Sequence, residues 1–134
     1  MKKIYFLLLA LIMTSLSFGQ SSDLYISMVA EGSSNNKFIE IYNGTGADIN
    51  LIDYAFPSTS NAPSEPGEYE YWNTFTADAL VAAGDVYVIA HPSADASILA
   101  QADQTHLYLS NGDDGYALVK NDGSWSDTDG DGVI

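Results

Sequence analysis

The residues of this chain best suited to chemistry form an acidic run near its C-terminus, Asp127-Thr128-Asp129-Gly130-Asp131-Gly132-Val133-Ile134. Asp127, Asp129 and Asp131 stand at alternate positions, as do the first three carboxylate ligands of an oxygen-lined calcium loop. Gly132 supplies the sharp turn, and the Val133 carbonyl would be the next ligand. The spacing predicts a calcium site at these three aspartates and Val133. The last ligands of such a loop would lie beyond the given sequence, and the alternative interpretation is a solvated acidic turn.

The sequence gives little indication of a catalytic site. The chain has no Cys, so it has no thiolate nucleophile, thiolate zinc site or disulfide. His91 and His106 are the only imidazoles, and no H-x-x-x-H spacing that favours a zinc site is present. Glu68 and Glu70 alternate as a glycosidase pair could, but a solvated strand face is the simpler interpretation. No G-x-S-x-G nucleophile elbow occurs, and we therefore expect no enzyme activity.

Binding surfaces are better supported than active sites. Four aromatic residues lie close together in the sequence, namely Tyr69, Tyr71, Trp72 and Phe75. They could form a stacking platform for a carbohydrate or a peptide, although core and edge packing is the commoner role of such residues. The acidic segment 111–115 is interpreted as a hairpin turn. The Asn43-Gly44-Thr45 sequon is weak evidence of glycosylation because it coincides with a predicted tight turn.

The N-terminus is typical of a secretory signal peptide. Two lysines precede an apolar run over residues 4–13, and small residues, Ser17 and Gly19, precede a cleavage position. A membrane anchor is disfavoured because the apolar run is too short for a hydrocarbon core of ~30 Å. The sequence predicts a signal peptide over 1–19, a mature domain over 20–134, and a secreted, extracellular or cell-surface location.

The charge of the chain excludes one class of partner. The whole sequence has 4 Lys plus Arg against 18 Asp plus Glu, a formal charge of −14, and none of the basic residues is Arg. Residues 20–134 retain two lysines, so their formal charge is −16. A field of this sign repels nucleic acid and anionic lipid and attracts cations. We expect no direct nucleic-acid binding and no membrane span after signal cleavage.

The elements that must position these residues are short strands. Apolar runs divided by Gly, Asn, Asp and Pro predict strands at 24–30, 37–42, 49–56, 69–75, 85–90, 106–109 and 115–120. The last two are expected to pair as a hairpin. An alanine-rich segment, 93–103, predicts one short helix with Ser93 or Asp95 as its N-cap. Period-2 patterning and frequent turns indicate an all-β sandwich or barrel of one domain.

Three segments of the chain resemble the bacterial lamin-tail domain family. They are Phe38-Ile39-Glu40-Ile41-Tyr42-Asn43, Gly84-Asp85-Val86-Tyr87-Val88-Ile89-Ala90 and Asn111-Gly112-Asp113-Asp114-Gly115-Tyr116-Ala117-Leu118-Val119. The resemblance covers about 23–134. It implies an immunoglobulin-like antiparallel β-sandwich with one short helix, and a further strand beyond Ile134, so that the last strand would be truncated. It also implies an exported, non-catalytic module, and it supplies no active-site residues.

The functional hypothesis is a secreted interaction module of lamin-tail type, rigidified by calcium, that binds a protein or an extracellular polymer. The alternative is an N-terminal accessory part of a larger secreted hydrolase, such as an extracellular nuclease, whose catalytic domain lies elsewhere. The sequence does not specify the ligand or the oligomeric state.

Overall fold

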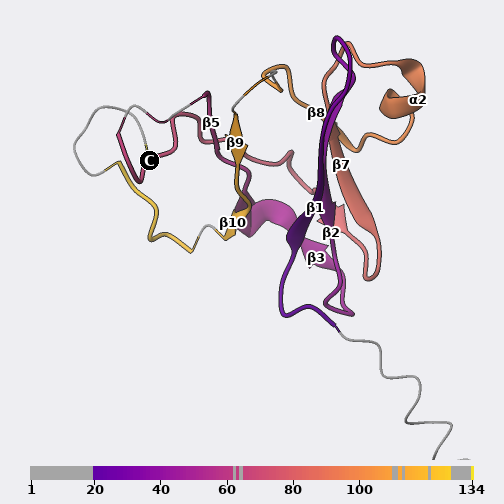
Figure 1. Ribbon diagram of the computed structural model, residues 1–134. Helices are drawn as coiled ribbons and strands as arrows, with labels where there is room; N and C mark the ends of the chain where they lie inside the picture. Colours follow the sequence, from indigo (N-terminus) through magenta and orange to yellow (C-terminus); the bar gives the residue numbers. More distant parts are fainter. Residues whose placement is uncertain are drawn as a thin grey trace, which may run out of the picture.

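The computed structural model describes residues 20–61, 63, 65–109, 112, 114–120, 122–127 and 134. Within these residues the elements are, in chain order, β1 (Tyr25–Glu31), β2 (Lys37–Tyr42), β3 (Ile49–Asn50), η1 (Leu51–Asp53), β4 (Tyr54–Ala55), β5 (Ser58–Thr59), β6 (Leu80–Val81), β7 (Val86–Ala90), α2 (Ala96–Leu99), β8 (Gln104–Thr105), β9 (Gly115–Tyr116) and β10 (Val119–Lys120) (Figure 1). The predicted all-β class with one short helix is confirmed.

The largest sheet contains β1, β2, β7 and β8, in that order. Ile39 on β2 lies at the centre of its register, opposite Val29 on β1 and Ile89 on β7. Side chains of a strand alternate between faces, so Ile39 and Ile41 both point into the core and are fully buried. The strand predicted at 37–42 is confirmed, and β7 begins one residue after its predicted start.

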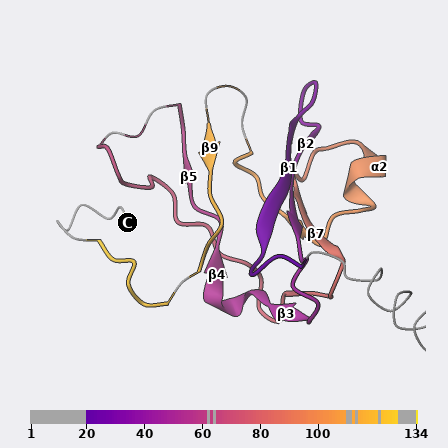
Figure 2. The same ribbon diagram turned by 60° about the horizontal axis from the view of Figure 1, so that its bottom comes forward.

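A second layer consists of three two-stranded ribbons, β3–β6, β4–β10 and β5–β9. Figure 2 shows β4, β5 and β9 on one side and β1, β2 and β7 on the other. The strand predicted at 49–56 is interrupted by η1, a 3-10 turn. The Asn50 side chain accepts a hydrogen bond from the Ile52 N–H at 2.8 Å and so caps this turn. Tyr54 and Leu51 nevertheless face inward and are buried.

The hydrophobic core fills the space between the two layers. Phe56, from the loop after β4, is fully buried, and its ring lies 5.1 Å from the ring of Phe75. Phe75 in turn contacts Tyr87 of β7 edge-on at 5.6 Å. Burying one such side chain stabilises the fold by about 1.5–3 kcal/mol. Aromatic contacts from three distant segments therefore hold the ribbons against the sheet.

The helix is shorter than the predicted 93–103. It spans Ala96–Leu99 and lies beside β7, on the side of the sheet away from the ribbons (Figure 1). Ile98 and Leu99 are half-buried. Asp95 occupies the N-cap position, but its carboxylate accepts a hydrogen bond from the Asn36 amide at 2.8 Å rather than from the helix. This helical crossover explains why β8 runs parallel to β7, the one parallel pair among the described strands.

The predicted strands at 69–75 and 106–109 are both wrong, since neither forms a strand. Residues 69–75 contribute only isolated bridges, at Tyr71 and Thr74. The hairpin between 106–109 and 115–120 does not form, because β9 pairs with β5 and β10 pairs with β4. A turn signal in the sequence does not specify which strand the chain meets after the turn.

The Asn43-Gly44 turn also differs from its prediction. It does not join paired strands, because β2 pairs with β1 and β7 while β3 pairs with β6. In this segment, Gly46 is the residue with a positive φ angle, 82°. Within the part of the chain that the structure describes, no helix has the length and apolarity needed to cross a membrane.

Candidate functional site

A cavity of about 530 Å³ lies beside β5 and β9. Its lining comes from four separate segments: Ser58, Thr59, Ser60, Tyr71, Leu107, Tyr108, Asp114 and Tyr116. Tyr71, Leu107 and Tyr108 expose 55%, 58% and 75% of their surface. Large apolar side chains gathered at one open concavity are typical of a binding site rather than of ordinary surface.

Backbone pairing positions two of the tyrosines on either side of β5. Ser58 pairs with Tyr116 of β9 along one edge. Along the other edge, the Ser58 N–H donates to the Tyr71 carbonyl at 2.9 Å, and the Tyr71 N–H donates to the Ser58 carbonyl at 3.1 Å. The Asn73 amide adds bonds of 3.1 Å to the Phe56 carbonyl and the Ser58 hydroxyl. The floor of the cavity is therefore a hydrogen-bonded ribbon.

The third tyrosine is supported by the core. The rings of Tyr108 and His106 are 5.8 Å apart, and His106 packs edge-on against buried Phe56 at 5.3 Å. Burial lowers the pKa of His106 below its usual 6.5, and the nearby His91 lowers it further. His106 therefore acts here as a packing residue between the core and the cavity wall.

Two carboxylates hold the polar end of this region. Asp114 accepts a hydrogen bond from the Asn61 N–H at 3.1 Å. Glu70 accepts one from the Ser60 N–H at 2.7 Å. Both carboxylates thus tie the loop after β5 to neighbouring segments, and Asp114 also lines the cavity.

No basic side chain lines the cavity, and the two lysines of residues 20–134 are engaged elsewhere. Lys37 is 5% exposed, and its ammonium donates to the Ser34 carbonyl at 2.6 Å. The Lys120 ammonium lies 5.5 Å from the centre of the Tyr54 ring. The cavity therefore offers aromatic faces, hydroxyls and a carboxylate without a cationic counterpart, which disfavours an anionic ligand.

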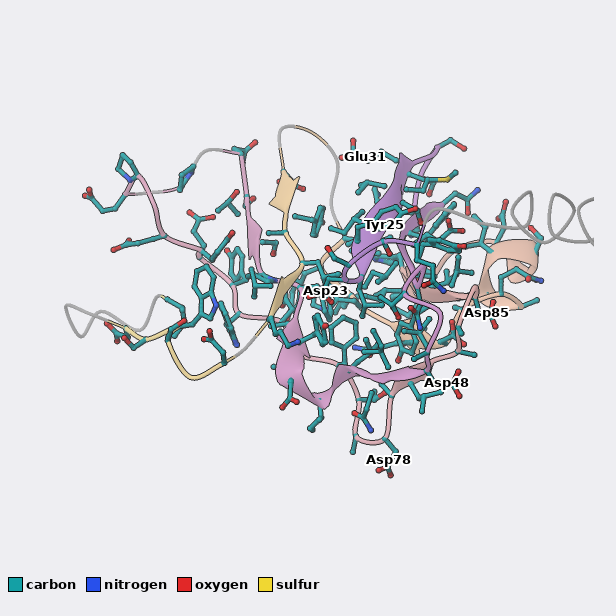
Figure 3. All side chains as sticks on the ribbon, turned by 90° about the horizontal axis from the view of Figure 1, so that it is seen from below. Asp23, Tyr25, Glu31, Asp48, Asp78 and Asp85 are labelled. Atoms are coloured by element: carbon teal, nitrogen blue, oxygen red, sulfur yellow. The ribbon has the colours of Figure 1, made fainter. Side chains whose placement is uncertain are left out.

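A second exposed feature is the outer edge of the large sheet. Among the described strands, β2 is the one that pairs with β1. Tyr25, Met28 and Val29 of β1 expose 46%, 49% and 47% of their surface. Figure 3 labels Tyr25 and Glu31, the two ends of this seven-residue strand. A long strand with apolar side chains and one unpaired edge is a template for another strand.

The predicted calcium loop lies almost entirely outside the described residues. This applies to Asp129, Asp131 and Val133, whereas Asp127 is described and exposed. Within the described residues no group of three His, Asp or Glu side chains is arranged to hold a metal. The calcium site remains a prediction from the sequence.

The predicted aromatic group is divided between three locations. Phe75 belongs to the core, and Tyr71 lines the cavity. Tyr69 and Trp72 cluster with Trp125, with ring centroids 5.6 to 6.4 Å apart. Leu107, Tyr108 and Tyr116 also line the cavity, and nothing in their local sequence pattern indicates that they lie near Tyr71.

The family model described as Lamin Tail Domain matches residues 19–130. The chain belongs to this family. The match confirms the resemblance drawn from the sequence, and with it the immunoglobulin-like sandwich. No curated protein and no solved structure matches the chain in the corresponding searches.

In this lamin tail domain the sequon residue Asn43 is a structural side chain. It is fully buried, and its amide donates to the carbonyls of Ala47 at 2.7 Å and Val81 at 2.9 Å. Its oxygen accepts from the Thr45 N–H at 3.1 Å and from the Thr45 hydroxyl at 2.8 Å. The nitrogen to which a glycan would attach is thus occupied within the fold.

Proposed function

We propose that this lamin tail domain is an exported, non-catalytic module that holds an extended segment of a partner protein along the outer edge of β1. The observation that carries the proposal is the seven-residue edge strand with three half-exposed apolar side chains. Strand addition uses main-chain hydrogen bonds for affinity and alternate side chains for specificity. β1 offers both elements.

The local structure of β1 makes this edge accessible. Natural edge strands are commonly protected by lysines, prolines or a covering segment. β1 contains no Lys or Pro. Its irregularity is a bulge between Ile26 and Met28, where the Ser27 hydroxyl donates to the Glu40 carboxylate at 2.7 Å. The stretch from Met28 to Glu31 pairs regularly with β2 and is the part best suited to accept a further strand.

Charge restricts the identity of the partner. Residues 20–134 carry a formal charge of −16, so an acidic segment is repelled. The same repulsion opposes pairing with a second copy of this chain. An uncharged or basic segment of a different protein is therefore the occupant that the electrostatics favour.

Export rests on the N-terminal sequence, and the non-catalytic role rests on the family and on the residues present. Lys2, Lys3 and the apolar run after them are typical of a cleaved leader. The mass of the chain recovered from outside the cytoplasm should correspond to a product that begins at Gln20. An uncleaved chain retained in the membrane would contradict export.

The partner proposal is tested by selecting displayed peptides against the purified chain. Bound peptides are expected to lie along β1 and to protect its outward amides from hydrogen exchange. Val29→Lys places a charge on the edge and should weaken binding at least tenfold. The matched control is Leu80→Lys, which adds the same charge at another half-exposed strand position and should bind as the wild type does.

Three results would contradict the proposal. One is failure to select any peptide, and another is binding that leaves the β1 amides unprotected. The third is concentration-dependent dimerisation in light scattering that Val29→Lys abolishes. In that case the occupant of the edge is a second copy of the chain.

A further inference from the structure

The cavity beside β5 and β9 has two chemically different walls. Leu107, Tyr71 and Tyr108 form an apolar and aromatic wall, and more than half of each side chain is exposed. Ser58, Thr59 and Ser60 also line the cavity, and Asp114 adds a carboxylate. The Ser58 hydroxyl accepts a hydrogen bond from the Asn73 amide, and the Ser60 hydroxyl accepts one from the Asn61 amide. A ligand that fits both walls has an apolar stem and a polar end.

The charges around the cavity select the sign of that polar end. Asp114 lines it, Glu70 bonds to the backbone of its wall at Ser60, and no basic side chain faces it. The faces of tyrosine rings attract cations, and the net negative charge of the domain raises the local concentration of cations. A cationic group is therefore favoured over a neutral group, and an anionic group is disfavoured.

The hydrogen-bonding groups select the kind of cation. A carboxylate and hydroxyl oxygens are acceptors for N–H donors. An ammonium or guanidinium group supplies such donors, whereas a quaternary ammonium has none. Lysine and arginine both carry this charged end on an aliphatic stem that packs against apolar and aromatic surfaces.

We propose that this cavity binds the side chain of a lysine or arginine from a partner protein. The stem lies against Leu107 and the tyrosine rings, and the charged end lies near Asp114 and the serine and threonine hydroxyls. The cavity is large enough, at about 530 Å³, to admit the side chain together with adjoining backbone. This is a second contact site, independent of strand addition at β1.

The test is an NMR titration of the full chain with Nα-acetyl-lysine methylamide and its arginine counterpart. Saturable shifts are expected for the ring resonances of Tyr71, Tyr108 and Tyr116. The norleucine derivative has a stem of similar length and no charge. Its affinity should be lower than that of the lysine derivative by roughly threefold or more, as expected when a partly exposed cation–π contact is lost. Choline and glucose test a quaternary cation and a neutral polyol.

Matched variants distinguish the cavity from the general field of the protein. Tyr108→Ala removes a side chain that is 75% exposed, so folding should not suffer, and binding should fall several-fold. Asp114→Asn keeps the oxygen that can accept from Asn61 and removes one charge. The controls are Ile52→Ala, which removes an apolar side chain that is 65% exposed, and Asp78→Asn, which removes one charge, both outside the cavity. Both controls should bind as the wild type does.

Several results would overturn the proposal. Equal affinity for the norleucine and lysine derivatives would mean an apolar site without charge preference. Tighter binding of glucose or choline would assign the cavity to another ligand class. Equal losses in Asp114→Asn and Asp78→Asn would mean attraction by net charge alone. Absence of saturable shifts would mean that the cavity does not bind these side chains. None of these results depends on strand addition at β1.

Discussion

The phenolic hydroxyl of Tyr54, on β4, donates a hydrogen bond to the carboxylate of Asp23, just before β1. This contact joins the segment that enters the large sheet to a ribbon of the opposite layer. The bond from Tyr54 is the main reason that the pKa of Asp23 lies below its usual 3.8. Burial, followed by the bond to Asp23, raises the pKa of Tyr54. Figure 3 labels Asp23 close to the middle of the molecule.

Tyr54→Phe should destabilise the protein by about 1 kcal/mol at neutral pH, because it removes a partly exposed hydrogen bond to a charged group. A carboxyl whose folded-state pKa is lowered contributes stability that is present above its unfolded pKa and is lost as the pH falls through the folded value. The difference between wild type and variant should therefore shrink below pH 3.8. Urea unfolding of both proteins between pH 3 and 7 measures this difference in the free energy of unfolding. A constant difference over this range would contradict the assignment.

Replacing Asn43 should be more costly. Asn43→Ala leaves the buried carbonyl of Val81 and the turn at Ala47 without their donor, and we expect a loss of roughly 3 kcal/mol. Asn43→Asp should lose more, since it places a carboxylate against carbonyl oxygens. Denaturant unfolding provides the measurement. Asn50→Ala, which removes only the exposed cap of Ile52, is the control and should cost about 0.5–1 kcal/mol.

Long strands were predictable from the sequence because their period is visible in it. Lys37–Tyr42 alternates between buried and half-buried residues, and Val86–Ala90 is a β-branched and aromatic run between turns. The ribbons β4–β10 and β5–β9 contain two residues per strand. Two residues have no period, and their partners lie far along the chain, so local patterns could not specify the pairing.

The candidate cavity was only partly predictable for the same reason. Tyr71 belonged to an aromatic group that stands out in the sequence, but Tyr108 and Tyr116 appeared to be ordinary strand residues. Tyr116 lies near Tyr71 because Ser58 pairs on both sides, with Tyr116 along one edge and Tyr71 along the other. Tyr108 is held by its contact with His106, which packs on Phe56. A contact made by long-range pairing has no signature in a single local segment.

The stability of the domain should depend on pH through His106. Its folded-state pKa lies below 6.5, so the unfolded chain binds more protons as the pH falls below that value. The contribution of neutral His106 is fully present above pH 6.5 and decreases as the pH falls through the interval down to the folded pKa. His106→Phe preserves the packing on Phe56 and should show a smaller decrease between pH 7 and 5. Thermal unfolding across this range compares the two proteins, and identical pH profiles would refute the role of His106.

Calcium should bind through Asp127, Asp129 and Asp131 if the predicted loop forms. Trp125 lies two residues before the loop and contacts Tyr69 and Trp72, so ordering of the loop should change its fluorescence. Isothermal calorimetry should detect binding that Asp127→Asn with Asp129→Asn weakens at least tenfold. Asp78→Asn with Asp85→Asn removes the same charge and is the control. An unchanged calcium affinity in the loop variant would contradict the calcium site and favour the interpretation as a solvated acidic turn.

The pairing of Tyr54 with Lys120 and of Thr59 with Gly115 has a consequence for biogenesis. The ribosome finishes β4 and β5 long before it finishes the strands that complete them. A nascent chain can align β1, β2 and β7 early, but β4 and β5 lack these strand partners until residues 115–120 have been synthesised. Completion of the two ribbons should therefore be a late step in the folding of this domain.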